Sequence, residues 1–197
     1  MKPRVFIFIG MSGCGKGTQA ELLINLLKEK DPSHDVLYVQ TGQGFRNFIK
    51  GDSFTQRRTK EIMQSGDLLP EFMAIHVWAD ALVDNYKDGN HVIFDGTPRK
   101  LHEAEVLHSV FDFYGLTQPT VIYLDIGDAE ATKRLLLRKR ADDTPASIKE
   151  RLGWYKKEVV EALEFFKGNK DYLFLKINGE GSVERIHQDI VKMAGLE

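Results

Sequence analysis

The chain has 197 residues, which is enough for one domain with a sizeable hydrophobic core. Its formal net charge of −2 at pH 7 gives no electrostatic reason to expect nucleic acid or an anionic membrane as a partner. A single cysteine excludes an internal disulfide and a cysteine-rich zinc site. The apolar stretches are all shorter than a membrane span, so we expect a cytoplasmic protein.

Short apolar runs alternate with longer segments of helical spacing along the chain. The apolar runs predict strands at residues 5–9, 36–39, 91–94, 120–125 and 172–177. The intervening segments predict helices at residues 16–30, 70–87, 101–114, 128–138, 145–167 and 182–193. Runs rich in Val, Ile and Phe are typical of strands buried on both faces. The alternation therefore predicts a three-layer α/β domain, with a five-stranded parallel sheet flanked by helices.

A glycine-rich loop follows the first predicted strand and leads into the first predicted helix. Its sequence is Gly10-Met11-Ser12-Gly13-Cys14-Gly15-Lys16-Gly17-Thr18. Glycines let backbone N–H groups turn toward anionic oxygens, and the helix N-terminus and Lys16 add positive charge. The pattern G-x4-G-K predicts a phosphate-binding loop and hence a P-loop NTPase-like fold. Gly17 stands where Ser or Thr usually meets Mg²⁺, and the hydroxyl of Thr18 follows one position later.

Residues 41–70 interrupt the alternation of strands and helices. The stretch contains no strand pattern, several charges and the helix breakers Gly51, Gly66 and Pro70. We expect a small, mobile helical lobe that leaves the sheet and returns to it.

Polar residues follow the predicted strands at the points where the strands end. Thr41 and Arg46 follow the second strand, the segment 95–99 (Asp-Gly-Thr-Pro-Arg) follows the third, and Gly181 follows the fifth. Since ligands of open parallel sheets bind beyond the carboxyl ends of the strands, these residues predict a ligand crevice. An acid placed like Asp95 holds Mg²⁺ in phosphate-loop proteins, often through water.

Arginines are concentrated in the C-terminal half of the chain. Arg134 and Arg138 are four residues apart and share a face of the predicted helix. Arg140 follows closely, just before a break that suits a moving flap, and Arg151 lies in the next predicted helix. Phosphoryl transfer requires in-line positioning and cations that neutralise charge on the transferred group. The sequence therefore predicts phosphoryl transfer in a site that closes to exclude water.

In these motifs the chain resembles the adenylate kinase family of nucleoside monophosphate kinases, from about residue 5 to residue 191. Residues 13–20 (Gly-Cys-Gly-Lys-Gly-Thr-Gln-Ala) read like that family's phosphate loop. Thr41-Gly42…Arg46 is similar to Thr-Gly-Asp-x-x-Arg, and residues 95–99 are similar to Asp-Gly-Phe-Pro-Arg. The lid-flanking arginines of the family are matched by Arg134-x3-Arg138 and by Arg140-x-Asp142-Asp143-x7-Arg151.

The resemblance implies a monomeric enzyme that reversibly transfers the γ-phosphoryl group of Mg-ATP to a nucleoside monophosphate. By the same resemblance, ATP is bound by Gly13, Cys14, Gly15, Lys16, Gly17, Thr18, Arg134, Arg138 and Gly181. The acceptor is bound by Thr41, Arg46, Asp67, Leu68, Leu69, Gly96, Thr97, Pro98, Arg99, Glu103, Arg140 and Arg151. The catalytic side chains nearest to the transferred group are Lys16, Arg99, Arg138, Arg140 and Arg151. Asp95 orients Mg²⁺ through water.

Two departures from the family pattern concern the metal and the lid. Gln43 stands where the family has Asp, so one acid near the water shell of the metal is absent. Only Lys139 separates Arg138 from Arg140, where family members carry a loop or a longer domain. The predicted lid is therefore minimal, at residues 138–143, and a single cysteine excludes a cysteine-rich zinc site in it.

A third departure is Glu103, at the position of the glutamine that reads the adenine of AMP. Adenine presents a donor beside an acceptor, which an amide complements and an ionised carboxylate does not. Guanine presents two adjacent donors, which suit a carboxylate better. In favour of AMP, Thr41 is the residue that AMP-selective members of the family carry. AMP is thus the favoured acceptor, and GMP or a pyrimidine monophosphate is the alternative. If Glu103 contacts the base, Glu103→Gln is predicted to raise selectivity for AMP over GMP. A shift of the helix by one residue would instead take Glu103 away from the base.

Two other functions stay open at this point. A kinase for a small metabolite would use the same phosphate loop, although the segment 95–99 argues against it. A nucleotide-binding regulatory protein without turnover would explain the short lid and Gln43, although the retained arginines argue against it.

Overall fold

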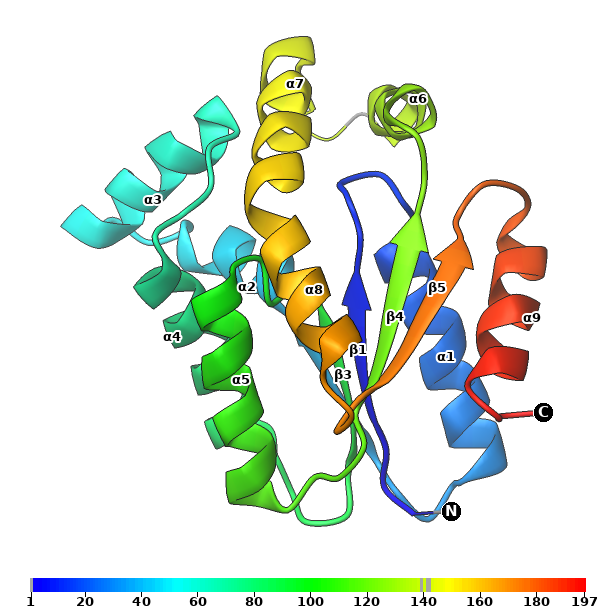
Figure 1. The fold of residues 1–197 in the computed structure, drawn as a ribbon. Helices are drawn as coiled ribbons and strands as arrows, with labels where there is room; N and C mark the ends of the chain where they lie inside the picture. Colours follow the sequence, from blue (N-terminus) through cyan, green and yellow to red (C-terminus); the bar gives the residue numbers. More distant parts are fainter. Residues whose placement is uncertain (1, 139, 141–142) are drawn as a thin grey trace.

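The computed structural model describes residues 2–138, 140 and 143–197. A five-stranded, fully parallel sheet lies at the centre of this structure (Figure 1). Its strands are β1 (Val5–Ile9), β2 (Val36–Gln40), β3 (His91–Asp95), β4 (Thr120–Asp125) and β5 (Leu173–Asn178). They lie in the order β2-β3-β1-β4-β5, so that β1 occupies the middle. Every residue of β1 and β3 is buried, which confirms the strands expected from the apolar runs.

Helices cover both faces of the sheet. Helices α1 (Lys16–Lys30) and α9 (Val183–Met193) lie together on one face, and α5 (Leu101–Tyr114) and α8 (Val160–Gly168) lie together on the other (Figure 1). Helix α4 (Glu71–Asn85) contacts β2, and α6 (Asp128–Arg138) and α7 (Pro145–Trp154) contact each other beyond the carboxyl ends of the strands. The predicted three-layer α/β fold is confirmed, with element ends within two residues of the expected ones in most cases.

One predicted helix is divided in the structure. The segment 145–167 consists of α7, a π-helical turn η1 (Tyr155–Val159) and α8. A π turn inserts one residue into the helical repeat. Tyr155 and Val159 are buried in the core, while the preceding Trp154 is only half-buried and lines a cavity. Reading a helical period from sequence does not detect one inserted residue, which explains the difference.

Residues 41–70 contain the helices α2 (Thr41–Phe48) and α3 (Phe54–Ser65). Helix α2 contacts β3, and α3 extends away from the sheet (Figure 1). A small apolar cluster of Phe45, Leu69, Met73 and Ala74 joins this segment to α4, separately from the main core. The end of α3 contacts α7. Of the predicted lid at residues 138–143, the structure describes Arg138, Arg140 and Asp143, and residues 139, 141 and 142 lie outside the described residues.

A cluster of Asp31, His34 and His91, in which Asp31 and His91 are buried, lies at the opposite end of the sheet, where β3 begins. The backbone N–H of Arg4 donates to Nδ1 of His91 at 3.0 Å. The imidazole then carries its proton on Nε2, which faces Oδ2 of Asp31 at 3.3 Å. A metal at Nε2 would require the proton to move to Nδ1, opposite the N–H of Arg4. The cluster is therefore suited to joining β1, β3 and the end of α1 by hydrogen bonds.

None of the helices in the described part of the chain is both long enough and apolar enough to cross a membrane.

Candidate active site

A cavity of about 610 Å³ lies beyond the carboxyl ends of the strands, between the phosphate loop, residues 41–70 and helices α6 and α7. This size is typical of small-molecule sites. The predicted site residues that line it are Gly13, Cys14, Gly15, Lys16, Gly17, Thr18, Arg46, Asp67, Leu69, Asp95, Gly96, Arg99, Arg134, Arg138, Arg140, Arg151 and Gly181. The fold therefore brings together residues that are far apart in the sequence, from Gly13 to Gly181.

The phosphate loop is shaped by glycines in the left-handed backbone region. Gly13 has φ of 88°, and a Cβ atom there would lie 2.8 Å from the carbonyl oxygen of Ala131, so this position requires glycine. Helix α1 begins at Lys16, directly after Gly15 with φ of 98°. The ammonium of Lys16 donates to the carbonyl oxygens of Gly10 at 2.7 Å and Met11 at 3.1 Å. A helix N-terminus and an ammonium therefore meet in one loop, as anion binding requires.

Arg134 of α6 lies beside the phosphate loop. Its Nε donates to Oε1 of Glu130 at 2.7 Å, and its Nη1 approaches the carbonyl oxygen of Cys14 at 3.5 Å. Both Glu130 and Arg134 line the cavity. Glu130 thus fixes the direction of the guanidinium along the edge of the loop.

Asp95 ends β3 beside the phosphate loop and is 8% exposed. Tyr38 donates its hydroxyl to Oδ2 of Asp95 at 3.0 Å, and Nε2 of Gln40 donates to the same oxygen at 3.4 Å. Burial and then the charge of Asp95 raise the pKa of Tyr38, so the phenol stays a proton donor. A Cβ atom at Gly17 would lie 3.7 Å from Oδ2, which places the carboxylate next to the loop.

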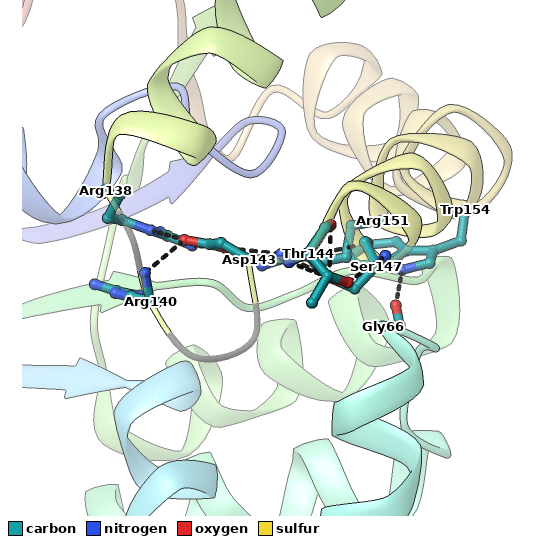
Figure 2. Close-up of polar contacts among 8 residues, drawn as sticks. All are labelled: Gly66, Arg138, Arg140, Asp143, Thr144, Ser147, Arg151 and Trp154. Atoms are coloured by element: carbon teal, nitrogen blue, oxygen red, sulfur yellow. Dashed lines mark hydrogen bonds and ion pairs between the residues drawn. The ribbon is translucent and has the colours of Figure 1, made fainter.

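Asp143 forms ion pairs with two arginines of the site (Figure 2). Arg138 donates Nε to Oδ2 and Nη2 to Oδ1 of Asp143, both at 2.8 Å, and Nη2 of Arg151 donates to Oδ1 at 2.7 Å. The backbone N–H of Arg140 approaches Oδ2 at 3.4 Å. Burial favours the neutral acid, but the hydrogen bonds from Arg138 and Arg151 outweigh it and lower the pKa of Asp143 to about 2. The carboxylate therefore holds the two guanidinium groups side by side.

Two more arginines lie on the side of the cavity near residues 41–70. Arg99 donates Nε to the carbonyl oxygen of Gly96 at 2.8 Å, and its burial lowers the pKa of the guanidinium without removing its charge. Arg46 donates Nε to Oε1 of Gln43 at 2.9 Å. Gln43, which departs from the family's Asp, thus acts as a neutral acceptor for Arg46.

Five of the predicted site residues are not among those that line the cavity: Thr41, Leu68, Thr97, Pro98 and Glu103. Pro98 lines a small adjoining cavity of about 40 Å³ instead. Thr41 is buried, and its hydroxyl has no hydrogen-bond partner among the described residues.

Glu103 lies behind the cavity, with 2% of its surface exposed. One carboxylate oxygen accepts from the hydroxyl of Thr97, and the other accepts from the backbone N–H of Arg99 at 2.8 Å. Burial raises the pKa of Glu103, and both hydrogen bonds oppose that effect. Thr97, which stands where the similar motif has Phe, thus contacts Glu103. The structure does not bring Glu103 to the position expected of a base-reading residue, because both of its oxygens are used in holding the loop before Arg99.

Sequence reasoning overlooked several side chains of the site. Asp143 lies between Arg138 and Arg151 in the sequence, and an acid between two arginines is a signal for an ion pair. Trp154 was not singled out, although it lies three residues after Arg151 and so shares a helix face with it. The sequence carried no comparable signal for the contacts of Tyr38 and Gln40 with Asp95.

A parallel sheet with a phosphate loop after its central strand, and arginines converging on the same cavity, defines a phosphate-loop phosphotransferase. Comparison with known proteins narrows this class. The family model described as adenylate kinase matches residues 8–171. The chain therefore belongs to the adenylate kinase family.

Individual relatives agree with this assignment over nearly the whole chain. The chain is 34% identical over 190 residues to an adenylate kinase of Leptospira biflexa, covering 94% of this chain and 97% of that protein. An adenylate kinase of Bacteroides fragilis is 32% identical over 190 residues, with 94% and 95% covered. One of Prochlorococcus marinus strain MIT 9301 is 34% identical over 184 residues, with 93% and 94% covered.

Proposed function

We propose that this protein catalyses the reversible transfer of the γ-phosphoryl group of Mg-ATP to a nucleoside monophosphate, with AMP as the acceptor. The observation that carries the proposal is that the phosphate loop, Arg46 and Arg99 open into one cavity, with Arg138 and Arg151 on its wall. Two anionic substrates can therefore face each other there, with cations between them.

The donor side is built from the phosphate loop. Backbone N–H groups of residues 13–18 would bind the ATP phosphates, and Lys16 would follow the group that is transferred. Arg134 would lie against the adenine, because Glu130 directs its guanidinium along the edge of the loop. Gly181 would pass its backbone beside the same base.

The acceptor side is built from residues 41–70 and the segment after β3. Arg46 and Arg99 would bind the phosphate of the monophosphate, and Thr41, Gly96 and the backbone of residues 97–98 would shape the site around it. Leu68, Leu69 and Asp67 would border the base. The lobe at residues 41–70 would close over this acceptor.

Between the two substrates, Arg138, Arg140 and Arg151 would bracket the transferred phosphoryl group. Charge on its equatorial oxygens would be neutralised by guanidinium groups that Asp143 holds in advance. Closure of the lobe and of the minimal lid at residues 138–143 would exclude water, which would otherwise accept the phosphoryl group.

Asp95 fits the role of holding Mg²⁺ through water. Its carboxylate lies beside the phosphate loop, and one of its oxygens is fixed by Tyr38. Mg²⁺ keeps several waters when one or two carboxylates hold it, so a single acid is enough. When bound, the ion neutralises charge on the phosphate oxygens.

A coupled assay of ADP formation tests the proposal. Mg-ATP is offered with AMP, GMP, CMP, UMP and a panel of small-metabolite acceptors in turn, and turnover with AMP alone is the expected result. Turnover with another monophosphate would keep the class and change the acceptor. ATP binding without turnover on any of these acceptors would favour a regulatory protein, and turnover only on a small metabolite would favour the other kinase class.

The position of Glu103 leads to a prediction about selectivity. We expect Glu103→Gln to leave the ratio of kcat/KM for AMP and GMP within about twofold of the wild type, because the carboxylate faces Thr97 and the N–H of Arg99. A glutamine can accept from that N–H, and the hydroxyl of Thr97 can turn to accept from the amide. The same assay with both acceptors measures this ratio.

Glu103→Leu serves as the matched variant, since it removes both acceptors at similar volume. We expect it to raise the KM for AMP through a loosened Arg99 and to lower stability by about 1–3 kcal/mol. A large change of the AMP-to-GMP ratio in Glu103→Gln would restore the base-reading hypothesis.

A further inference from the structure

Trp154, the last residue of α7, connects parts of the molecule that are distant in sequence (Figure 2). Its indole Nε1 donates to the carbonyl oxygen of Gly66 at 3.0 Å, across 88 positions of the chain. Gly66 directly follows α3 and is buried, whereas Trp154 is only half-buried. The bond therefore ties the last turn of the lobe at residues 41–70 to the helix that carries Arg151.

The backbone at Gly66 is fitted to this contact. Gly66 has φ of 85°, and a Cβ atom there would lie 2.8 Å from the Cα atom of Ser147 in α7. Only glycine combines this positive φ with the absence of a Cβ atom. The backbone at the end of α3 can therefore lie directly against the backbone near the start of α7. The carbonyl oxygen of Gly66 is thereby held where the indole reaches it.

The same indole ring also contacts Arg99. The guanidinium carbon of Arg99 lies 5.5 Å from the ring centroid, which is the distance of a cation–π contact. Nε of Arg99 is already held by Gly96, so the ring fixes a second side of the guanidinium. One side chain thus contacts the lobe through its N–H and Arg99 through its π face.

We propose that Trp154 is a positioning residue, which orients Arg99 for the phosphate of the acceptor when residues 41–70 are docked on α7. This inference rests on the proposed function, because it concerns the acceptor. The N–H of Trp154 fixes the docked lobe, and the ring fixes Arg99. Movement of the lobe away from α7 breaks the bond to Gly66 and frees the indole, so lobe position and arginine placement are coupled.

Two substitutions separate these contacts. Trp154→Phe keeps an aromatic ring over Arg99 and removes the donor to Gly66. We expect the KM for AMP to rise about fivefold, the size of one hydrogen bond, with kcat and the KM for ATP within about twofold. Trp154→Leu also removes the π face, so kcat should fall by a further factor of about five to ten. Phe113→Leu, at a side chain 81% exposed on α5, is the matched control and should change none of these constants.

Tryptophan fluorescence reports whether AMP reaches the surroundings of the indole, because Trp154 lines the cavity. The protein contains two tryptophans, and Trp78 is 1% exposed in the main core. We expect AMP to change the emission of the wild type, and the change to be absent in Trp154→Phe. ATP alone should produce a much smaller change.

The outcomes distinguish this inference from the proposed function. Wild-type constants in both variants, an equal rise of the ATP and AMP KM values, or an AMP response that persists in Trp154→Phe would overturn the role of Trp154. If the wild type shows no turnover on any monophosphate, the proposed function fails, and calorimetric titration with AMP still decides the inference: a Kd for AMP that is raised in Trp154→Phe and not in Phe113→Leu supports it, and an equal Kd in the two variants overturns it.

Discussion

Replacing Lys16 with methionine is expected to lower kcat by about 10²- to 10³-fold while the fold is retained. Methionine has a similar length but carries no charge, so it removes the cation that would follow the transferred phosphoryl group. Among the described residues, the ammonium donates within its own loop, to the carbonyl oxygens of Gly10 and Met11 and to Sγ of Cys14. Those contacts are local, so the loss should appear in the chemical step. The rate of ADP formation with saturating Mg-ATP and AMP measures it.

A control variant separates the loop lysine from the general charge of α1. Lys28 lies exposed in the last turn of the same helix, at the end away from the phosphate loop. Lys28→Met removes the same charge and should keep kcat within about twofold of the wild type. Circular dichroism and Tm establish that both variants are folded. Wild-type turnover in folded Lys16→Met would contradict the proposed mechanism.

The fold was accessible from sequence because burial and hydrophobicity coincide in the central strands. All five residues of β1 are apolar and buried, so a continuous apolar run marks the strand without ambiguity. The edge strand β5 alternates between buried and exposed positions, and its bounds shifted by one residue. Edge strands carry a weaker signal because one side of the pattern is solvated.

The site was accessible only in part, since motif spacing states which residues share an element but not which side chains pair. The family resemblance placed Glu103, four residues after Arg99, at the position of a base-reading glutamine. The structure turns this side chain toward Thr97 and the backbone of Arg99. Such a choice depends on a neighbouring hydroxyl and on burial, which neither periodicity nor charge pattern contains.

The pairing of Asp143 with Arg138 and Arg151 leads to the second large effect. We expect Asp143→Asn to lower kcat by about 10- to 100-fold, because two guanidinium groups that a carboxylate held together are left to repel each other. Removing one partner of a buried ion pair costs about 3–5 kcal/mol. Since the side chain of Arg138 is 32% exposed, we expect a smaller loss of stability, about 1–2 kcal/mol. Urea unfolding measures this difference.

The pH dependence of that stability difference follows from the pKa of Asp143, which is lowered from its ordinary value of 3.8 to about 2. A carboxyl group whose pKa is lower in the folded state stabilises the fold fully above its unfolded pKa and loses that contribution as the pH falls. The advantage of the wild type over Asp143→Asn should therefore be constant from about pH 7 to about pH 5 and shrink between about pH 4 and pH 2.

An exposed ion pair provides the comparison that decides this prediction. Asp52 pairs with Arg57 at 3.3 Å, and the side chain of Asp52 is 94% exposed. Asp52→Asn should change stability by less than about 0.5 kcal/mol at any of these pH values and leave kcat unchanged. If Asp143→Asn behaves like Asp52→Asn in both measurements, the carboxylate does not organise the arginines. If only stability differs, Asp143 holds the lid segment without presenting Arg138 and Arg151 to the substrates.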